Sequence, residues 1–347
     1  MSADGGGSAL ALAIRRLASH ESLTADQAAS AFEVVMRGEA TPAQIGALLA
    51  ALRVKGETPD EVAGAARALR GAMIGLAADA PDALVDTCGT GGGTVTTFNI
   101  STASALAAAG AGVRIAKHGN RSFTSKSGSA DVLEALGVTI DVPPATMAKA
   151  LAEAGIVFMF APLLHPAMRH VGPVRRELAI PTVMNIVGPL ANPARAGRQV
   201  VGVAEAARLP LIAGALRALG TVHALVVHGA PGLDEISPLG PTTVIELRDG
   251  VERPWTIDPQ ALGLPSVSAD ELAGGGPADN AAIIEAVLGG GGPTGARVAV
   301  ALNTAAALYV SGRGLSFEES LAAAQRALDA RVGLAALERL RAAFRIA

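Results

Sequence analysis

Cysteine is almost absent from this sequence of 347 residues, which contains only Cys88. A single cysteine excludes an internal disulfide framework and is typical of proteins from a reducing compartment. Excess charge of either sign is also missing, since the net charge is -3 and the isoelectric point is about 6.1. The sequence therefore lacks the general basic surface of nucleic-acid-binding proteins, and we expect no nucleic-acid partner.

Long apolar runs are missing as well, although 50% of the residues are hydrophobic. Apolar segments such as 103–109 and 156–160 are interrupted by glycine, proline or polar residues well before the about 20 residues that span a bilayer. The N-terminal stretch carries Arg15 and Arg16 but lacks the charged, apolar and cleavage regions of a signal peptide. We therefore expect a soluble, cytoplasmic protein with no membrane partner, long enough for about two domains.

The first part of the chain has the pattern of a small helical domain. Three helix starts are indicated by a threonine that glutamine or glutamate follows three residues later, as in a capping box. The pairs are Thr24 and Gln27, Thr41 and Gln44, and Thr58 and Glu61. We predict a helical domain over residues 1–76, with a linker at 75–81.

After this linker the pattern changes to alternating strands and helices. Five short apolar runs fit buried parallel strands, at residues 83–86, 113–116, 156–160, 198–203 and 223–228. Helical segments lie between them, at 103–111, 132–136, 144–154 and 209–219. Segments 242–247 and 251–257 flank Asp249 and Gly250, which predicts a β-hairpin. We predict a larger α/β domain over residues 80–347 with a mainly parallel central sheet, in which the glycine clusters at 274–276 and 289–292 are connectors without chemistry.

Two polar segments follow the first two predicted strands. Residues 89–93 are rich in glycine, and residues 117–121 read Lys-His-Gly-Asn-Arg. Ligands of parallel α/β sheets bind beyond the carboxyl ends of the strands. Glycines let the backbone approach a bulky anion, amides and hydroxyls at a helix start hold phosphates, and the basic residues add positive charge. We predict a large phosphate site. The alternatives are an ordinary strand-to-helix turn capped by Asn99, Ser101 or Thr102, and a solvated basic turn.

Two further motifs add chemistry to this site. Asp234 and Glu235 follow the predicted strand 223–228, and adjacent carboxylates beside a polyphosphate favour Mg²⁺. Two solvated acids in a turn are the alternative. Arg175 presents a planar fork suited to a carboxylate, with a surface arginine as the alternative interpretation.

Together these motifs resemble the anthranilate phosphoribosyltransferase family of tryptophan biosynthesis, over almost the whole chain. The most specific segments are 89–92, 97–102, 117–121, 128–131 and 232–235. The resemblance implies a helical domain completed by helices near 165–190, an α/β domain, and a homodimer formed through the helical domains. It implies substrates in the hinge cleft: the donor phosphoribosyl pyrophosphate (PRPP) with Mg²⁺, and the acceptor anthranilate. Association with an anthranilate synthase stays open.

The resemblance also implies roles for individual residues. PRPP would contact Gly89, Gly92, Gly93, Thr97, Asn99, Ile100, Ser101, Thr102, Lys117, His118, Gly119, Asn120, Arg121, Ser122, Ser125 and Ser129. Anthranilate would contact Gly89, His118, Asn120, Arg175 and Pro189. Mg²⁺ would bind through Ser101, Asp234 and Glu235. The residues expected to act in catalysis are Lys117, Asn120 and Arg175, and His118 is not expected to be a base.

The sequence departs from the family pattern at two places. Gly93 stands where the family usually has Asp, which removes one contact to metal or ribose. Pro181 and Met184 stand where it commonly has Arg and Phe, which reshapes the wall around the aromatic acceptor. A pyrimidine-nucleoside phosphorylase is a rival interpretation, disfavoured because its basic segment typically reads Lys-His-Ser. A catalytically silent relative that binds nucleic acid is a second rival, which the acidic isoelectric point opposes.

Overall fold

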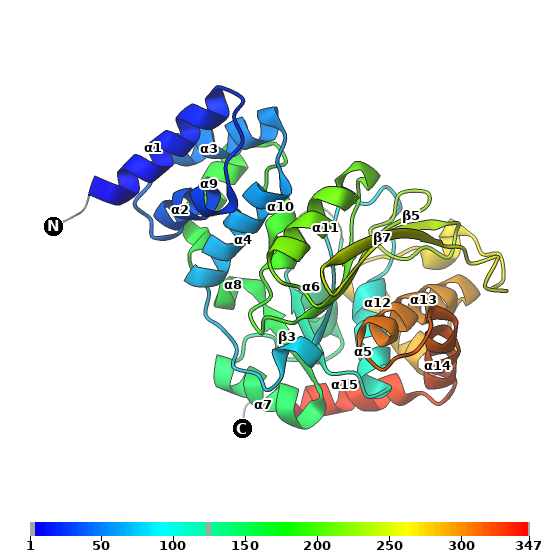
Figure 1. Cartoon of the computed structure of the whole chain (residues 1–347). Helices are drawn as coiled ribbons and strands as arrows, with labels where there is room; N and C mark the ends of the chain where they lie inside the picture. The colour runs from blue at the N-terminus through cyan, green and yellow to red at the C-terminus, as the bar shows by residue number, and fades with distance from the viewer. Residues whose placement is uncertain (1–3, 123–125, 346–347) are drawn as a thin grey trace. The chain divides into compact units, whose positions relative to one another are not determined.

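The computed structural model describes residues 4–122 and 126–345 of the chain (Figure 1). The chain divides into two compact units, which are described separately below. Unit 1 comprises Met1–Gly75, Pro162–Pro193 and Pro210–Gly220. Unit 2 comprises Leu76–Ala161, Ala194–Leu209 and Thr221–Ala347. No helix within the described ranges is long and apolar enough to cross a membrane.

Unit 1 opens with four helices, α1 (Asp4–Ala18), α2 (Ala25–Met36), α3 (Pro42–Lys55) and α4 (Pro59–Ala72). The threonine hydroxyls before α2, α3 and α4 accept hydrogen bonds of 3.2, 3.3 and 3.3 Å from the backbone of the third helical residue. These capping boxes satisfy helix-start amides, and the predicted starts are confirmed. Glu61 is fully buried and also accepts from Lys55 Nζ at 2.9 Å, so it ties α3 to α4.

Later segments complete unit 1. These are α8 (Ala161–Leu164), α9 (Met168–Leu178), α10 (Met184–Val187), η2 (Gly188–Leu190) and α11 (Leu209–Ala218). Helix α9 packs on α2 and α3, and α10 packs on α4. Residues 210–220 belong to this unit, whereas the sequence-based boundaries leave them with the α/β domain. Gly214 allows this packing, because a Cβ there would lie 2.9 Å from Pro59.

Unit 2 is built on a sheet that has seven strands within the described residues, in the order β3-β2-β1-β4-β5-β6-β7. The strands are β1 (Val85–Gly89), β2 (Ile115–Gly119), β3 (Ile156–Phe160), β4 (Arg198–Gly202), β5 (His223–Gly229), β6 (Thr242–Arg248) and β7 (Val251–Ile257). The first five pair in parallel, and β6 and β7 are antiparallel. In the turn between β6 and β7, Asp249 and Gly250 both have positive φ, 51° and 79°. The predicted mainly parallel sheet and the hairpin are confirmed.

Strands β1 and β2 extend three residues further than the sequence predicts. Pairing continues to Gly89 opposite Gly202 and to Gly119 opposite Phe160. Lys117 and His118 are therefore strand residues and not part of a loop, which corrects the prediction. The apolar pattern breaks at Lys117, but backbone pairing with β3 does not depend on it.

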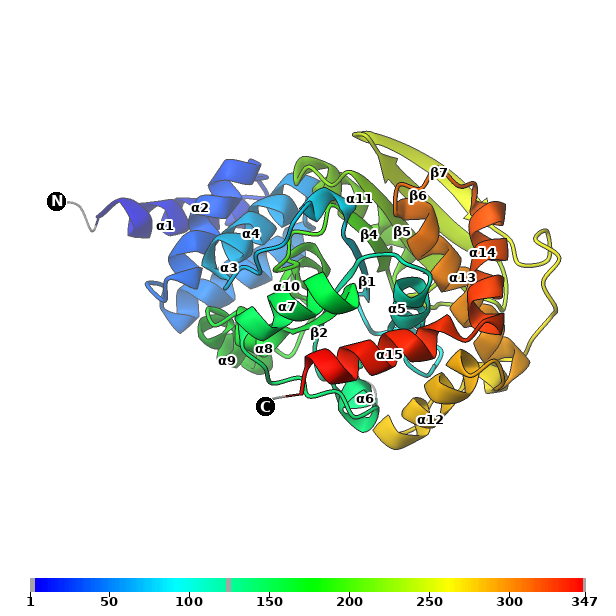
Figure 2. The ribbon, with the colours of Figure 1, turned by 90° about the horizontal axis from the view of Figure 1, so that it is seen from below.

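Helices cover the sheet of unit 2. They are α5 (Ile100–Gly110), α6 (Ser129–Ala135), α7 (Pro144–Ala154), α12 (Pro277–Leu288), α13 (Thr294–Val310), α14 (Phe317–Asp329) and α15 (Val332–Ala343). Short 3-10 turns are η1 (Pro81–Ala83), η3 (Ala206–Arg208) and η4 (Ala269–Leu272). Figures 1 and 2 show α13, α14 and α15, in orange and red, gathered around α5, and α5 and α13 both contact β1. The C-terminal helices thus support the first strand and the helix that follows it.

Candidate active site

The order of the strands reverses between β1 and β4. From β1 the chain proceeds to β2 and β3 on one side, and then to β4 and β5 on the other. Ligands of open α/β sheets bind at such a switch point, beyond the carboxyl ends of the strands. Here these ends are Gly89 and Gly202, which pair with each other. A Cβ on Gly89 would lie 2.5 Å from Asp234 Oδ2, and one on Gly202 would overlap the Asp234 backbone. Two glycines thus admit an acidic residue to the switch point, and sequence reasoning missed Gly202.

The glycine-rich loop after β1 folds over this acid. The Gly91 amide donates to Asp234 Oδ2 at 2.8 Å, and the Thr94 amide donates to Gly232 O at 2.9 Å. Gly91 and Gly92 have φ values of 71° and 85°, which other residues rarely adopt. The Cβ of any residue replacing Gly93 would lie 3.3 Å from Asp234 Oδ1. Glycine at position 93 therefore keeps a second acidic side chain away from Asp234.

Lys117 is 3% exposed and points into unit 2. Its Nζ donates to Thr87 O at 2.6 Å and to Ser101 Oγ at 3.2 Å. Burial lowers the pKa of Lys117, and the negative charge of buried Asp86 opposes that shift. The next residue, His118, donates its backbone N–H to Asp86 Oδ1 at 3.1 Å. The Lys117 ammonium is thus held between β1 and the first turn of α5.

Glu235 meets the same helix start. Its Oε1 accepts from the Ser101 amide at 3.1 Å. Desolvation, and next the charge of Asp234, raise the pKa of Glu235 to about 8. Desolvation also raises the pKa of Asp234, against the hydrogen bond from Gly91. The predicted metal ligands Ser101, Asp234 and Glu235 are therefore close together in unit 2.

The side-chain oxygen atoms of these three residues are of the kind that Mg²⁺ prefers. Within residues 4–122 and 126–345 no cluster of three or more His, Cys, Asp or Glu side chains could hold a metal ion by itself. Mg²⁺ usually keeps several waters and binds through one or two carboxylates together with substrate phosphates. Two adjacent carboxyl groups beside a phosphate-type loop match that requirement.

Asn303 holds the acidic turn in place from α13. Its Oδ1 accepts from the Ile236 amide at 3.0 Å, and its Nδ2 donates to Ile236 O at 2.9 Å. Asn303 is 3% exposed, so these bonds form away from water. The sequence alone gave Asn303 no individual role, because its partner lies 67 positions away.

The segment after β2 is fixed by Asp131 of α6. Its Oδ2 accepts from the Gly128 amide at 2.8 Å and from the Ser122 amide at 3.2 Å. Arg121 donates to Asp131 at 2.9 Å and to Glu134 at 2.6 Å, and it lies over the ring of Phe160. The charge of Arg121 is thus already paired. Ser125, also predicted to contact PRPP, lies outside the described residues.

Asn99 connects the loops after β1 and β2. It occupies the N-cap position of α5 but makes no side-chain cap bond, so the capping alternative is wrong for this residue. Instead its Nδ2 donates to Ser127 O at 3.0 Å, and its Oδ1 accepts from Ser127 Oγ at 3.2 Å. Ile100 and Thr102, in contrast, are buried in α5 at 0% and 1% exposure, so their side chains face the core.

The remaining predicted residues, Arg175 and Pro189, belong to unit 1. Arg175 is half-buried on α9, and burial lowers its pKa. Its Nη2 donates to Asn185 Oδ1 at 3.4 Å, and in the described part of the chain it pairs with no carboxylate. Asn185 also accepts from the Thr182 amide at 3.0 Å, and Pro189 is buried in η2. Arg175 therefore has capacity for an external carboxylate.

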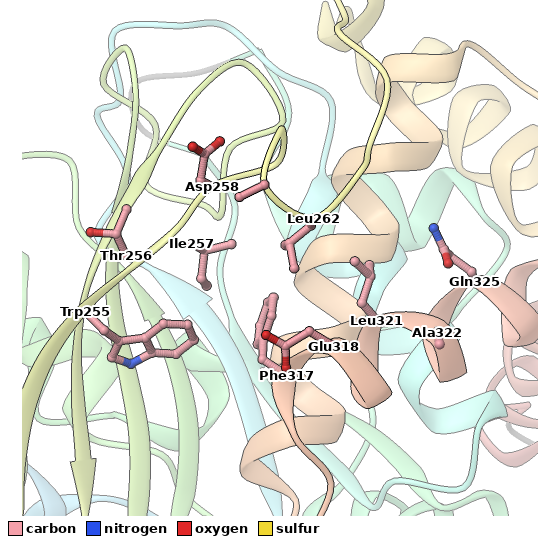
Figure 3. Close-up of a pocket in the computed structure, with 11 residues that line it drawn as sticks. Trp255, Thr256, Ile257, Asp258, Leu262, Phe317, Glu318, Leu321, Ala322 and Gln325 are labelled. Atoms are coloured by element: carbon pink, nitrogen blue, oxygen red, sulfur yellow. The ribbon is translucent and has the colours of Figure 1, made fainter.

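A separate hollow of about 490 Å³ lies between β7 and α14 (Figure 3). Trp255, Phe317 and Leu321 form its apolar wall, and Asp258 and Glu318 border it. None of its lining residues belongs to the predicted site.

Comparisons with known proteins agree with this geometry. The glycosyl transferase family a/b domain matches residues 81–335, and the glycosyl transferase family helical bundle domain matches residues 12–73. An anthranilate phosphoribosyltransferase from Thermomicrobium roseum is 50% identical over 332 residues, which cover 94% of this chain and 95% of the relative. The chain belongs to the anthranilate phosphoribosyltransferase family.

Solved structures of anthranilate phosphoribosyltransferases share the fold. The crystal structure from Thermus thermophilus is 41% identical, with a TM-score of 0.90 over 96% of this chain and 99% of that chain. The enzyme from Saccharomyces cerevisiae in complex with PRPP and Mg is 28% identical, with a TM-score of 0.86 over 97% of this chain and 98% of that chain. The chain is therefore a transferase of tryptophan biosynthesis, and the predicted family, fold class and enzyme class are confirmed.

Proposed function

We propose that the chain transfers the 5-phosphoribosyl group of PRPP to the amine of anthranilate. The C1–O bond to pyrophosphate breaks, a C1–N bond forms, and the amine gives up one proton. The observation that carries this proposal is the meeting of an anion-type loop, a buried lysine and two carboxyl groups at the β1/β4 switch point.

The donor would bind at the carboxyl ends of β1 and β2. The backbone at Gly91 and Gly92 can approach a bulky anion, because the space beside these glycines is open. The amide of Asn99 lies at the start of α5, and the hydroxyl of Ser129 lies at the start of α6. Breaking the C1–O bond creates oxocarbenium character in the sugar, so the departing pyrophosphate needs positive charge. Lys117 would supply this charge from its ammonium group, which is fixed beside the first turn of α5.

Mg²⁺ would be held by Asp234, Glu235 and the Ser101 hydroxyl, which lie close together. The yeast relative in complex with PRPP and Mg supports the use of this ion. When bound, the ion neutralises negative charge on the pyrophosphate. Desolvation raises the pKa values of both carboxyl groups, and a bound divalent cation would favour their ionised forms.

The site would promote the reaction by orienting the acceptor, without a strong general base. The amine of anthranilate is a neutral nucleophile at about pH 7, so general-base catalysis is not obligatory. Arg175 would bind the acceptor carboxylate, Pro189 would line the aromatic ring, and Asn120 with His118 would place the amine. A homodimer formed through unit 1 also belongs to this proposal, and size-exclusion chromatography with light scattering tests it.

Loss of anthranilate fluorescence tests the function directly. We expect loss only when PRPP and Mg²⁺ are both present, and stoichiometric release of pyrophosphate. Fluorescence that stays constant in the complete mixture contradicts the proposal. A gel shift with DNA run in parallel tests the nucleic-acid alternative, and no shift is expected.

A further inference from the structure

Asn280 of α12 reaches the predicted donor site from a distant part of the chain. Its Nδ2 donates to Asn99 Oδ1 at 2.9 Å across 181 positions, and its Oδ1 accepts from the Gly275 amide at 2.7 Å. Asn280 is 2% exposed. A buried amide with both ends bonded is a strongly fixed group, because leaving either end unpaired there costs free energy.

The partner amide, on Asn99, is thereby oriented. Asn99 Oδ1 accepts two hydrogen bonds, from Asn280 Nδ2 and from Ser127 Oγ, which uses its acceptor capacity. Asn99 Nδ2 donates one hydrogen to Ser127 O. Among the described residues its second N–H has no protein partner. The amide is thus held so that it offers a donor.

The surrounding backbone fixes the same segment. The Phe98 amide donates to Leu272 O at 3.0 Å. A Cβ on Gly274 would lie 2.5 Å from Thr97 O, so this glycine permits close contact between residues 272–276 and the start of α5. The segment before α12 therefore supports residues 97–99 and is more than a connector, which corrects the sequence-based interpretation.

We propose that Asn280 is a positioning residue for the phosphoribosyl donor. It holds the Asn99 amide with N–H, and not C=O, available to the anionic pyrophosphate group. This inference rests on the proposed function and assigns a role in it to a residue on a C-terminal helix. An anion accepts hydrogen bonds and repels a carbonyl oxygen, so reversing this amide weakens donor binding.

The variants Asn280→Asp and Asn280→Ala separate orientation from packing. Aspartate has the same shape and still accepts from Gly275, but it cannot donate to Asn99 Oδ1. Its carboxylate favours the reversed Asn99 amide. We expect Asn280→Asp to raise the KM for PRPP by about tenfold or more, with kcat and the KM for anthranilate within about twofold. Asn280→Ala leaves the Asn99 amide less constrained but does not favour its reversal. We expect this variant to raise the KM for PRPP by only about threefold.

Two further variants serve as controls. Thr304→Val removes a buried hydroxyl on α13 that donates to Ser104 O of α5, and it should leave the KM for PRPP unchanged. In an Asn99→Ala background, Asn280→Asp should have no further effect on that KM, because the group it orients is gone. Additive effects contradict the inference, as do equal rises in both KM values.

Binding of pyrophosphate with Mg²⁺, measured by calorimetry, separates this inference from the proposed function. Weaker binding by Asn280→Asp than by wild type, with unchanged secondary structure, supports the positioning role whether or not anthranilate is the acceptor. Equal binding by the two proteins overturns it. If the wild type binds pyrophosphate but consumes no anthranilate, the proposed acceptor is wrong and the role of Asn280 is still decided.

Discussion

The amide of Gly91 donates a 2.8 Å hydrogen bond to the Asp234 carboxylate, although the two residues lie 143 positions apart. Asp234 thus accepts, at the glycine loop, a bond of the kind that a phosphate oxygen would accept there. The acidic turn and the glycine loop are therefore linked, so the proposed anion and metal sites are structurally coupled.

Replacing both Asp234 and Glu235 by alanine should abolish Mg²⁺-supported turnover. The two side chains supply the carboxylates of the proposed metal site, and we expect a loss of about 100-fold or more. Titration of activity with Mg²⁺ checks this. Asp258→Asn, a change in the separate hollow, is the control. A double variant with the wild-type metal titration would dismiss both residues as ligands.

Glu235→Gln should stabilise the metal-free protein at pH 8 while it destroys activity. The pKa of Glu235 is about 8 in the folded chain and 4.5 for an ordinary glutamate. Between pH 4.5 and pH 8 this carboxyl group is ionised in the unfolded chain but still protonated in the folded chain. The free energy of unfolding therefore falls as the pH rises through this range. Glutamine does not titrate, and we expect a gain on the order of 4 kcal/mol at pH 8 and little change near pH 4.5. Urea unfolding without Mg²⁺ at the two pH values measures this, and an equal gain at both would reject the titration as the cause.

Arg175→Ala should raise the KM for anthranilate by about tenfold or more and change the KM for PRPP much less. The guanidinium is half-buried and contacts only a neutral amide in the described structure, so an acceptor carboxylate would be its ion-pair partner. The exposed neighbour Arg176, replaced by alanine, is the matched control. Equal effects on both KM values would remove Arg175 from the acceptor site.

Gly202→Ala should lower both stability and activity. The added Cβ overlaps the backbone of Asp234, so the acidic turn must shift, at a cost of about 1–3 kcal/mol. We expect a lower melting temperature and a weaker response to Mg²⁺. Gly291→Ala is the control, because its Cβ would meet only ordinary contacts. A Gly202→Ala variant that melts and titrates like the control would show that the turn tolerates the shift.

The helix starts and the hairpin could be predicted from sequence because their causes are local. A capping box such as Thr58 and Glu61 spans three residues, and the turn at Asp249 and Gly250 spans two. The predicted ligands Ser101, Asp234 and Glu235 also lie together, because strand ends of one sheet meet at one edge.

The sequence-based predictions fail where contacts with residues far away in the sequence determine the local structure. Lys117 interrupts an apolar pattern, but pairing with Phe158 keeps it in β2. Asn99 has the residue type and position of a helix cap, and bonds to Ser127 and Asn280 override that preference. Asn280 itself lies in a glycine-flanked segment without any motif, so only tertiary contacts reveal its part.

One ammonium, on Lys117, is buried near the carboxyl groups of Asp86, Asp234 and Glu235. Without a divalent ion, desolvation raises the pKa values of Asp234 and Glu235, so keeping both carboxyl groups ionised in this interior costs free energy. Metal uptake should then act as a folding cofactor as well as a catalytic one. Chelators added during purification would shorten the lifetime of the native chain, because they remove a ligand that binds the folded state.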